Sequence, residues 1–376
     1  MKSFYSSGFK VILLFSIILL MGALFVFRGD PYKKIDDQHL LTEDSFDISD
    51  VANGEVEVIG DGGGLKDDPE SEESDLIVSD VGELLSNRDS LIDLNRGELQ
   101  VGVHSSKKED LVEFEDRTGA KTDIVAVHIH WGNESAFPKE YAEEINRRGA
   151  TVFIFWNPMN YNRSAEQQRR FHFDRILDGS WDDYIDEFIE DVKNYGGPVM
   201  IAPMEEVNGY WTFWGGPGGL YGTTEEYREV FRYLHERSQT ASNVQFVWVV
   251  NSLSVPNVPE NSFVKYYPGS EFVDVIGINV FNFGDPWVSF DELVRNSVVE
   301  LRSYQKPILI TSTASAEGES KALWIKGLFD SPYFTEGPLQ GFVWFNEDKE
   351  RNWLIWSDSE SLDVFRTGVQ NIKKSD

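Results

Sequence analysis

Eight short apolar runs, separated by amphipathic stretches, occupy the chain from about Glu98 to its end and constrain its fold most strongly. Most of these runs are apolar at consecutive positions, as is typical of strands buried on both faces of a parallel sheet. The predicted strands are Leu99–His104, Ile124–Trp131, Thr151–Trp156, Pro198–Met204, Val244–Asn251, Val273–Phe281, Pro307–Thr313 and Leu339–Phe345.

Helical periodicity occupies most of the intervals between these runs. The predicted helices are Lys139–Arg148, Trp181–Tyr195, Thr224–Thr240, Phe290–Tyr304 and Ser320–Phe329, with a final helix over Ser359–Ile372. Between the fifth and sixth strands the helical signal is weak. Eight strands alternating with helices over roughly 280 residues predict an α/β fold of the (β/α)8 TIM barrel type. A doubly wound open sheet is the alternative, but no glycine-rich dinucleotide loop follows the first strand.

The N-terminal quarter of the chain has a different composition. Phe9–Phe27 is almost continuously apolar, and a helix of this length spans roughly 28 Å, close to a bilayer core. We predict an N-terminal transmembrane signal anchor over residues 1–29, with a cleaved signal peptide as the alternative. Residues 31–90 contain 18 acidic residues against 4 basic ones, which predicts a disordered acidic linker over residues 30–95. The barrel domain then occupies residues 96–376.

The formal net charge of −30 argues against a nucleic-acid partner, and the absence of cysteine excludes disulfides and thiolate metal sites. Phosphate binding needs a surplus of Lys and Arg, so we expect no nucleic-acid partner. His128 and His130 share a strand face, but no third converging ligand is evident, so we predict no metal site and no cofactor. We expect a monomer in the cell membrane, held through its N-terminal helix with the barrel domain extracellular, or secreted if that segment is cleaved.

The segment Glu205–Trp214 directly follows the fourth predicted strand and combines two carboxylates, an Asn-Gly turn and four aromatic residues. In TIM barrels the catalytic side chains come from the C-terminal ends of the strands. A rigidly held carboxylate beside flat aromatic faces is typical of a glycosidase acid, and Glu206 is the candidate. The residues predicted to contact a sugar are His130, Trp131, Trp156, Glu205, Asn208, Trp211, Trp214, Phe281 and Trp344.

From about Gly97 onward the chain resembles glycoside hydrolase family 26, the family best known for endo-β-1,4-mannanases. The resemblance is carried by several motifs together: Gly179–Ile185, Glu206–Trp211, Tyr267–Gly277, Lys306–Ile308, Lys321–Ile325 and Trp344–Asn346, with Trp353, Ser357 and Ser361 after them. It implies a TIM barrel that acts on a β-linked polysaccharide by the retaining mechanism.

The same resemblance implies that Glu206 is the general acid/base and that Ser312 occupies the position of the nucleophile. Retaining glycosidases use two carboxyl groups about 5–5.5 Å apart, and the second one attacks the anomeric carbon. Serine is neutral and shorter, so it does not replace that carboxylate simply. The family's Arg, His and Tyr that support the nucleophile correspond to Ala202, Glu205 and Phe281. The residues on the acid/base side of the site are therefore retained, whereas those on the nucleophile side are replaced.

Three functions are compatible with this pattern. The first is a glycosidase acting on a polysaccharide such as β-mannan, with Glu205, Glu317 or Glu319 as the base that activates water. The second is a membrane-tethered glycan-binding protein that has lost hydrolysis, and the third is a scaffold in polysaccharide assembly. The fold and the acid/base motif favour the hydrolase class, with a β-glycan as the partner. They do not decide whether the protein cleaves that glycan.

Overall fold

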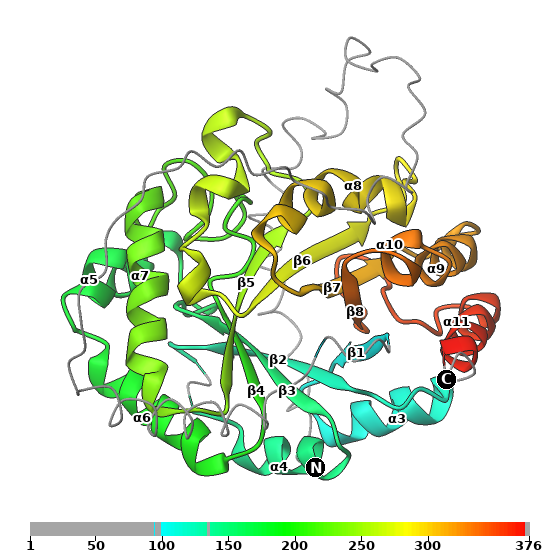
Figure 1. Ribbon diagram of the computed structural model, residues 1–376, viewed down its shortest axis with the longest axis horizontal. Helices are drawn as coiled ribbons and strands as arrows, with labels where there is room; N and C mark the ends of the chain where they lie inside the picture. Colours follow the sequence, from blue (N-terminus) through cyan, green and yellow to red (C-terminus); the bar gives the residue numbers. More distant parts are fainter. Residues whose placement is uncertain (1–93, 95–98, 134–135, 373–376) are drawn as a thin grey trace, which may run out of the picture.

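The computed structural model describes residues 94, 99–133 and 136–372, in which eight parallel strands form one closed barrel. Neighbouring strands follow the order of the sequence, and β8 pairs with β1 to complete the ring (Figure 1). The predicted TIM barrel is thereby confirmed and the open sheet is excluded. The strands are β1 (Gln100–His104), β2 (Ile124–His130), β3 (Thr151–Asn157), β4 (Val199–Pro203), β5 (Val244–Asn251), β6 (Val275–Asn282), β7 (Ile308–Ser315) and β8 (Leu339–Trp344).

Alternate side chains of the strands fill the inside of the barrel, as the pleat of a strand requires. The buried apolar residues of this inner cluster are Leu94, Ile124, Ala126, Phe153, Phe155, Met200, Ala202, Val247, Val249, Val275, Leu309 and Val343. Gly277 on β6 makes room for two neighbours, since a Cβ there would lie 2.6 Å from Val249 Cγ2 and 2.7 Å from Thr311 Cγ2.

Helices surround the strands and bury a larger apolar core between the two layers. The six predicted helices are confirmed, with small changes at their ends. The α-helices of the described residues are α3 (Lys108–Thr118), α4 (Lys139–Arg147), α5 (Phe173–Leu177), α6 (Asp182–Tyr195), α7 (Thr224–Arg237), α8 (Phe290–Leu301), α9 (Lys321–Phe329), α10 (Pro332–Thr335) and α11 (Ser359–Ile372).

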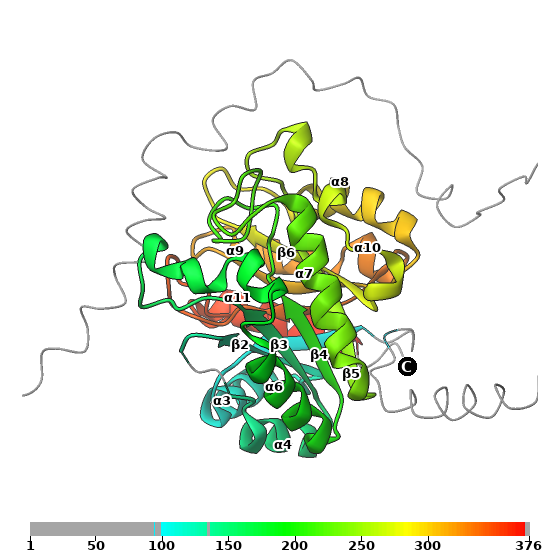
Figure 2. The same cartoon turned by 90° about the vertical axis from the view of Figure 1, so that its left-hand side faces the viewer.

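Helix α3 was not predicted from the sequence. Its buried residues are Leu111, Phe114 and Thr118, a narrow stripe among charged side chains, so its apolar periodicity is weak. It ends where Gly119 adopts a left-handed φ of 70°. In both views α3, α4 and α6 lie on one side of the barrel and α8 and α10 on the other (Figure 2). The last helix, α11, contacts α3 and α9.

Among the described residues, short 3-10 helices lie in several of the remaining connections. Three of them, η5 (Pro259–Asn261), η6 (Phe263–Tyr266) and η7 (Ser270–Phe272), join β5 to β6, where the sequence showed only a weak helical signal. The others are η3 (Ala165–Phe171), η4 (Ser238–Thr240) and η8 (Arg302–Tyr304).

Most of the N-terminal predictions concern residues that the structure does not describe. The expected anchor over residues 1–29 lies outside the described part, as does the expected linker apart from Leu94. Leu94 is buried at 2% exposure in the inner cluster of the barrel, so the folded domain includes this residue of the predicted linker region. Among the described residues, no helix is both long and apolar enough to cross a bilayer.

Candidate active site

Glu206 lies just past the end of β4, in a backbone conformation that few residues with a side chain adopt. Its φ is 56°, and that of Met204 is 55°, both in the left-handed region. Such a conformation costs roughly 1–2 kcal/mol per residue and persists only where the surroundings hold it. The Glu206 amide donates to the Val249 carbonyl at 3.0 Å, and the Gly209 amide donates to the Glu206 carbonyl at 2.8 Å. These bonds fix the point at which the carboxylate leaves the chain.

Three N–H groups from three segments donate to the Glu206 carboxylate. Trp211 Nε1 donates to Oε2 at 2.5 Å. Asn279 Nδ2 on β6 donates to Oε1 at 3.0 Å, and Asn251 Nδ2 on β5 approaches the same oxygen at 3.5 Å. The carboxylate is therefore held at the C-terminal ends of β4, β5 and β6. We call this end of the barrel, where all eight strands finish, the barrel mouth. The sequence indicated Glu206 and Trp211, but neither asparagine.

Asn208, one of the predicted sugar-contacting residues, joins the turn after β4 to β5. Its side chain is fully buried. Its Nδ2 donates to the Asn251 carbonyl at 2.8 Å and to the Ser254 hydroxyl at 3.2 Å, while its Oδ1 accepts from the Asn251 amide at 2.8 Å. Asn261 Nδ2 donates to the Asn208 carbonyl at 2.8 Å. All these partners belong to the protein, so Asn208 positions the Glu206 turn.

Glu205 is a mostly buried carboxyl group beside Glu206. Its Oε1 accepts from Asn157 Nδ2 at 3.0 Å and lies 3.8 Å from His128 Nε2. Burial, followed by the neighbouring charge of Glu206, raises the pKa of Glu205 to about 8. Glu205 is therefore a neutral acid at neutral pH. Its Oε2 and the Oδ1 of Asn157 are buried without a hydrogen-bond partner among the described residues. A proton on Oε2 turns this oxygen from an acceptor into a donor.

Three histidines stack at the ends of β1 and β2. The ring centroids of His104 and His128 are 5.3 Å apart, and those of His128 and His130 are 6.2 Å apart. Burial lowers the pKa of His104 to about 3, that of His130 to about 4, and that of His128 well below its usual value. These rings are therefore neutral at neutral pH. Within the described part of the chain, no three His, Cys, Asp or Glu residues converge to hold a metal ion.

Ser312 follows a bulge in β7. The pairing of β7 with β6 shifts by one residue at this point, so Thr311 is the extra residue and Ser312 pairs with Asn279. Ser312 is only 4% exposed. Thr311 Oγ1 donates to Asn279 Oδ1 at 2.7 Å. Because paired residues of neighbouring strands share a face of the sheet, Ser312 lies beside the asparagine that holds Glu206.

Four of the predicted sugar-contacting residues are buried tryptophans: Trp131, Trp156, Trp214 and Trp344, which are 3%, 0%, 4% and 0% exposed. Their rings belong to the larger apolar core. Trp156 Nε1 donates to the Tyr184 hydroxyl at 2.9 Å, and Trp214 Nε1 donates to the Glu205 carbonyl at 2.8 Å. In this structure the four tryptophans support the mouth from outside and present no open ring face to a ligand.

Residues next to these tryptophans on the same strands reach the mouth instead. Because side chains alternate along a strand, Phe345 lies on the same face as Val343 of the inner cluster, whereas Trp344 lies on the opposite face. The Phe345 ring meets His104 edge-on at 5.0 Å and Phe281 at 5.7 Å between centroids. Phe345 is thus a mouth residue that is absent from the predicted sugar contacts, and strict alternation from Val343 favours it over Trp344.

Exposed aromatic side chains are found on two connections at the mouth. Tyr210 and Trp211, between β4 and α7, are each 45% exposed. Phe283 and Trp287, between β6 and α8, are 40% and 38% exposed. The predicted contact residues His130 and Phe281 are half-buried. Of the predicted aromatic residues, Trp211 therefore combines the most open ring with a direct bond to Glu206.

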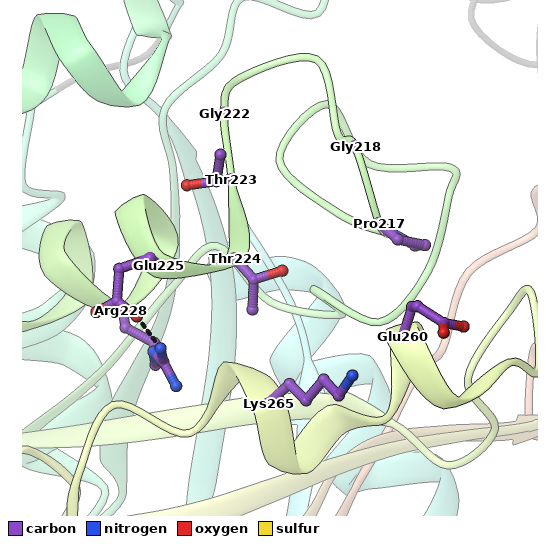
Figure 3. A pocket seen from close by; sticks show the side chains of 9 residues that line it. All are labelled: Pro217, Gly218, Gly222, Thr223, Thr224, Glu225, Arg228, Glu260 and Lys265. Atoms are coloured by element: carbon purple, nitrogen blue, oxygen red, sulfur yellow. Dashed lines mark hydrogen bonds and ion pairs between the residues drawn. The ribbon is translucent and has the colours of Figure 1, made fainter.

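A separate surface pocket of about 520 Å³ lies between the β4–α7 connection and the segment that contains η5 and η6 (Figure 3). Its lining residues are Pro217, Gly218, Gly222, Thr223, Thr224, Glu225, Arg228, Glu260 and Lys265. None of the predicted site residues lines it. Glu225 and Arg228 form an ion pair, and the Thr223 hydroxyl accepts from the Glu226 amide as the cap of α7. Glu225, Arg228 and Thr223 are thus engaged with other residues of the fold.

Comparison with known proteins decides the family. The model for Glycosyl hydrolase family 26 matches residues 55–335. The chain belongs to this family. The matched range begins inside the predicted linker, and its first residues lie outside the described part of the structure.

Several family relatives are similar in sequence. Endoglucanase H of Acetivibrio thermocellus is 33% identical over 307 residues, which cover 78% of this chain and 33% of that protein. The mannan endo-1,4-beta-mannosidase A and B of Caldalkalibacillus mannanilyticus is 22% identical over 182 residues, 46% of this chain and 31% of that protein. The chain spans about a third of the length of these relatives.

Solved structures share the fold of this family 26 member. A GH26 β-mannanase from Bacteroides ovatus has a TM-score of 0.58 at 20% identity, covering 77% of this chain and 94% of that one. A modular endo-β-1,4-mannanase from Cellulomonas fimi has a TM-score of 0.59 at 19% identity, covering 75% of this chain and 73% of that one. At these identities the likeness concerns the fold alone.

Proposed function

We propose that the barrel mouth of this family 26 member binds a β-1,4-linked glycan and that Glu206 occupies the general acid/base position. The observation that carries this proposal is the hold on Glu206, whose two carboxylate oxygens accept from Trp211, Asn279 and Asn251. A catalytic carboxylate needs such fixed geometry, because its reach to the glycosidic oxygen depends on small displacements. The relatives' names, an endoglucanase and mannan endo-1,4-beta-mannosidases, favour a β-glucan or a β-mannan as the glycan.

The exposed ring of Trp211 supports a sugar ligand. Its Nε1 is bonded to Glu206 while 45% of its surface stays open, so one face of the indole is available beside the carboxylate. Stacking buries the apolar face of a pyranose ring against the indole, and the contact is favoured because apolar surface is removed from water.

We further propose that retaining hydrolysis is lost. The second carboxylate of the retaining mechanism is replaced by Ser312, which is neutral. Glu205 does not serve as a base at neutral pH, because its pKa of about 8 keeps it protonated. Glu317 accepts from the Asn352 amide at 2.9 Å, and Glu319 is exposed on the connection after β7. In this proposal, neither Glu317 nor Glu319 acts as the second carboxylate beside Glu206.

Binding and cleavage can be measured separately on the full chain. We would incubate it with β-mannan, mixed-linkage β-glucan and xylan, and measure both retention on the insoluble glycan and the release of reducing ends. The expected result is retention on a mannan or a glucan without new reducing ends. Reducing ends that appear with the wild type and vanish in Glu206→Gln would show an active hydrolase. No retention on any of the three glycans would refute the glycan-binding function.

The site of action is a separate proposal that rests on the sequence. We propose that the apolar segment Phe9–Phe27 anchors the protein in the cell membrane and that the barrel, as a monomer, meets its glycan outside the cell. Alkaline extraction of membranes and protease treatment of intact cells test this. An extracted protein, or a barrel protected from the protease, would contradict it.

A further inference from the structure

Phe283 is an aromatic residue with an open ring directly after β6. Asn279, Phe281 and Phe283 lie on one face of this segment, because side chains of an extended chain repeat every two residues. Their exposure increases along the chain, from 4% for Asn279 through the half-buried Phe281 to 40% for Phe283. Since Asn279 donates to the Glu206 carboxylate, this series leads from the candidate acid/base residue out to solvent.

The ring of Phe283 rests on the buried ring of Trp353, which belongs to the connection between β8 and α11. The two rings meet edge to face at 5.3 Å between centroids, and Trp353 also contacts Phe281 at 5.4 Å. Trp353 is fully buried. Its amide donates to the Glu347 carbonyl at 3.0 Å, and its carbonyl accepts from Trp344 Nε1 at 3.1 Å. A tryptophan that is itself fixed therefore supports one side of the Phe283 ring.

Lys321, at the start of α9, holds the connection that carries Trp353. Lys321 is 1% exposed. Its Nζ donates to the Asn352 carbonyl at 3.1 Å, to the Leu354 carbonyl at 2.7 Å and to the Ser357 hydroxyl at 2.9 Å. Glu317 accepts from the Asn352 amide at 2.9 Å. Burial of a cation is unfavourable unless its donors are paired, and here each of the three ammonium donors has an acceptor. The connection beneath Phe283 is thus held by a charged clamp.

The backbone around Phe283 is fixed as well. Asn282 is buried, and its Nδ2 donates to the Ser315 hydroxyl at 3.0 Å. Its Oδ1 accepts from the Gly284 amide at 3.2 Å and from the Val288 amide at 3.4 Å. Phe283 therefore has a held backbone and a supported ring, although much of its surface is open. A ring that is already held loses little conformational entropy when it binds a ligand.

We propose that Phe283 binds a sugar unit of the glycan by stacking, and that Lys321 and Glu317 are the positioning residues that hold its support. This inference rests on the proposed glycan binding, and it assigns a sugar unit other than the one at Trp211. Four residues separate Asn279 from Phe283, and at about 3.3 Å per residue of extended chain this is about 13 Å. A sugar beside Glu206 therefore does not reach Phe283, and the ligand is an oligosaccharide of several units.

The test compares a β-1,4-linked hexasaccharide with the disaccharide of the same sugar, in the mannose and the glucose series, by NMR titration of the full chain. Phe283→Ala should weaken hexasaccharide binding by about tenfold, because burial of the aromatic surface is lost. Disaccharide binding beside Glu206 should not change. Phe283→Tyr keeps the ring and should bind both ligands as the wild type does. Val299→Ala, which removes an exposed apolar side chain from α8, is the matched control and should also bind normally.

A double variant tests whether the two rings contact different sugar units. The losses of hexasaccharide affinity in Trp211→Ala and Phe283→Ala should multiply when the substitutions are combined, because independent contacts contribute additively to the binding free energy. A double variant that binds no more weakly than the weaker single variant would show that both rings act on one sugar, and it would overturn the inference.

Lys321→Met tests the positioning role. Hydrogen exchange should accelerate at the amides of residues 352–355, and hexasaccharide binding should weaken by less than it does in Phe283→Ala, with disaccharide binding unchanged. Asn243→Ala is the matched control for lost stability, since this buried side chain donates to the Val192 and Gly197 carbonyls just before β5. It should bind both ligands normally. If Lys321→Met does not fold, Glu317→Ala serves the same comparison. Faster exchange without weaker hexasaccharide binding would overturn the positioning role.

The outcomes distinguish this inference from the proposed function. Equal hexasaccharide affinities of the wild type and Phe283→Ala overturn the inference and leave glycan binding intact. A loss in Phe283→Ala that is as large for the disaccharide as for the hexasaccharide also overturns it, because Phe283 would then act on the site beside Glu206. Failure of the wild type to bind either hexasaccharide would remove the proposed function itself.

Discussion

Side chains from β3 to β6 around Glu206 are joined by hydrogen bonds, whereas the mouth from Phe281 near the end of β6 round to β2 is lined by rings and one serine. We call the first group the amide side, formed by Asn157, Glu205, Glu206, Asn251 and Asn279. The second group is the ring side, formed by His104, His128, Phe281, Ser312 and Phe345. The two halves of the site can therefore be separated by their side chains, although β6 contributes Asn279 to one and Phe281 to the other.

The largest effect is expected from rebuilding the ring side. Ser312→Glu combined with Phe281→Tyr places a carboxylate and a hydroxyl donor where the family resemblance expects them. We predict that this double variant releases reducing ends from β-mannan or β-glucan about a thousandfold faster than the wild type, since a nucleophile then completes the pair. Ser312→Gln with Phe281→Tyr is the matched control and should stay inactive. An inactive double variant that still binds the glycan would show that the amide side is defective too.

The second effect concerns the charge of Glu205 on the amide side. Its pKa is raised from 4.5 to about 8, so the folded state holds a proton that the unfolded state releases. Stability should therefore fall as pH rises from about 4.5 to about 8. Relative to Glu205→Gln, the wild type should lose roughly 2–4 kcal/mol of unfolding free energy over this interval. Urea unfolding at several pH values measures this, and parallel curves for the two proteins would contradict it.

A smaller effect is expected where the Glu206 turn is joined to β5. Asn208→Ala removes a buried side chain that bonds to the Asn251 backbone and to Ser254. We predict a loss of about 2–3 kcal/mol in unfolding free energy, because buried partners are left without bonds. Asn194→Ala, at an exposed position of α6, should change stability by less than about 0.5 kcal/mol. Equal effects of the two substitutions would show that Asn208 does not hold the turn.

The smallest predicted effect tests the aromatic face beside the amide side. Trp211→Ala should weaken binding of a β-1,4-linked hexasaccharide by about tenfold, since a ring face and a bond to Glu206 are both lost. Trp211→Phe keeps the ring and should retain most of the affinity. Trp356, whose ring lies 4.7 Å from the Arg117 guanidinium carbon, provides the control, and Trp356→Ala should bind normally. Calorimetry that shows equal losses for both alanine variants would argue against a sugar at Trp211.

The strands and their order could be predicted from the sequence because consecutive apolar residues indicate buried parallel strands. The face that each residue takes was harder to predict. Trp156 and Trp344 are predicted sugar contacts because of their chemistry, although the alternation along β3 and β8 sends Asn157 and Phe345 to the mouth instead. At a strand end, the alternation of side chains between the two faces predicts which residue reaches the mouth better than residue type does.

Three features of the site depend on distant parts of the chain. Asn251 and Asn279 reach Glu206 only because the closed barrel brings the ends of β4, β5 and β6 together and because Glu206 adopts a left-handed φ. The bulge at Thr311 also has no local signal, since it follows from the pairing of β7 with β6. The Glu205 pKa depends on burial between these elements, which a sequence pattern does not contain.

The most direct test of whether the amide side and the ring side are separable is proton NMR of a β-1,4-linked hexaose incubated with the full chain. We predict that the hexaose binds, seen as broadened signals, and stays intact over a time in which the Ser312→Glu, Phe281→Tyr variant degrades it. New reducing-end anomeric signals with the wild type, absent in Glu206→Gln, would contradict the account. If those new signals were first β-configured, retention would be operating in spite of Ser312.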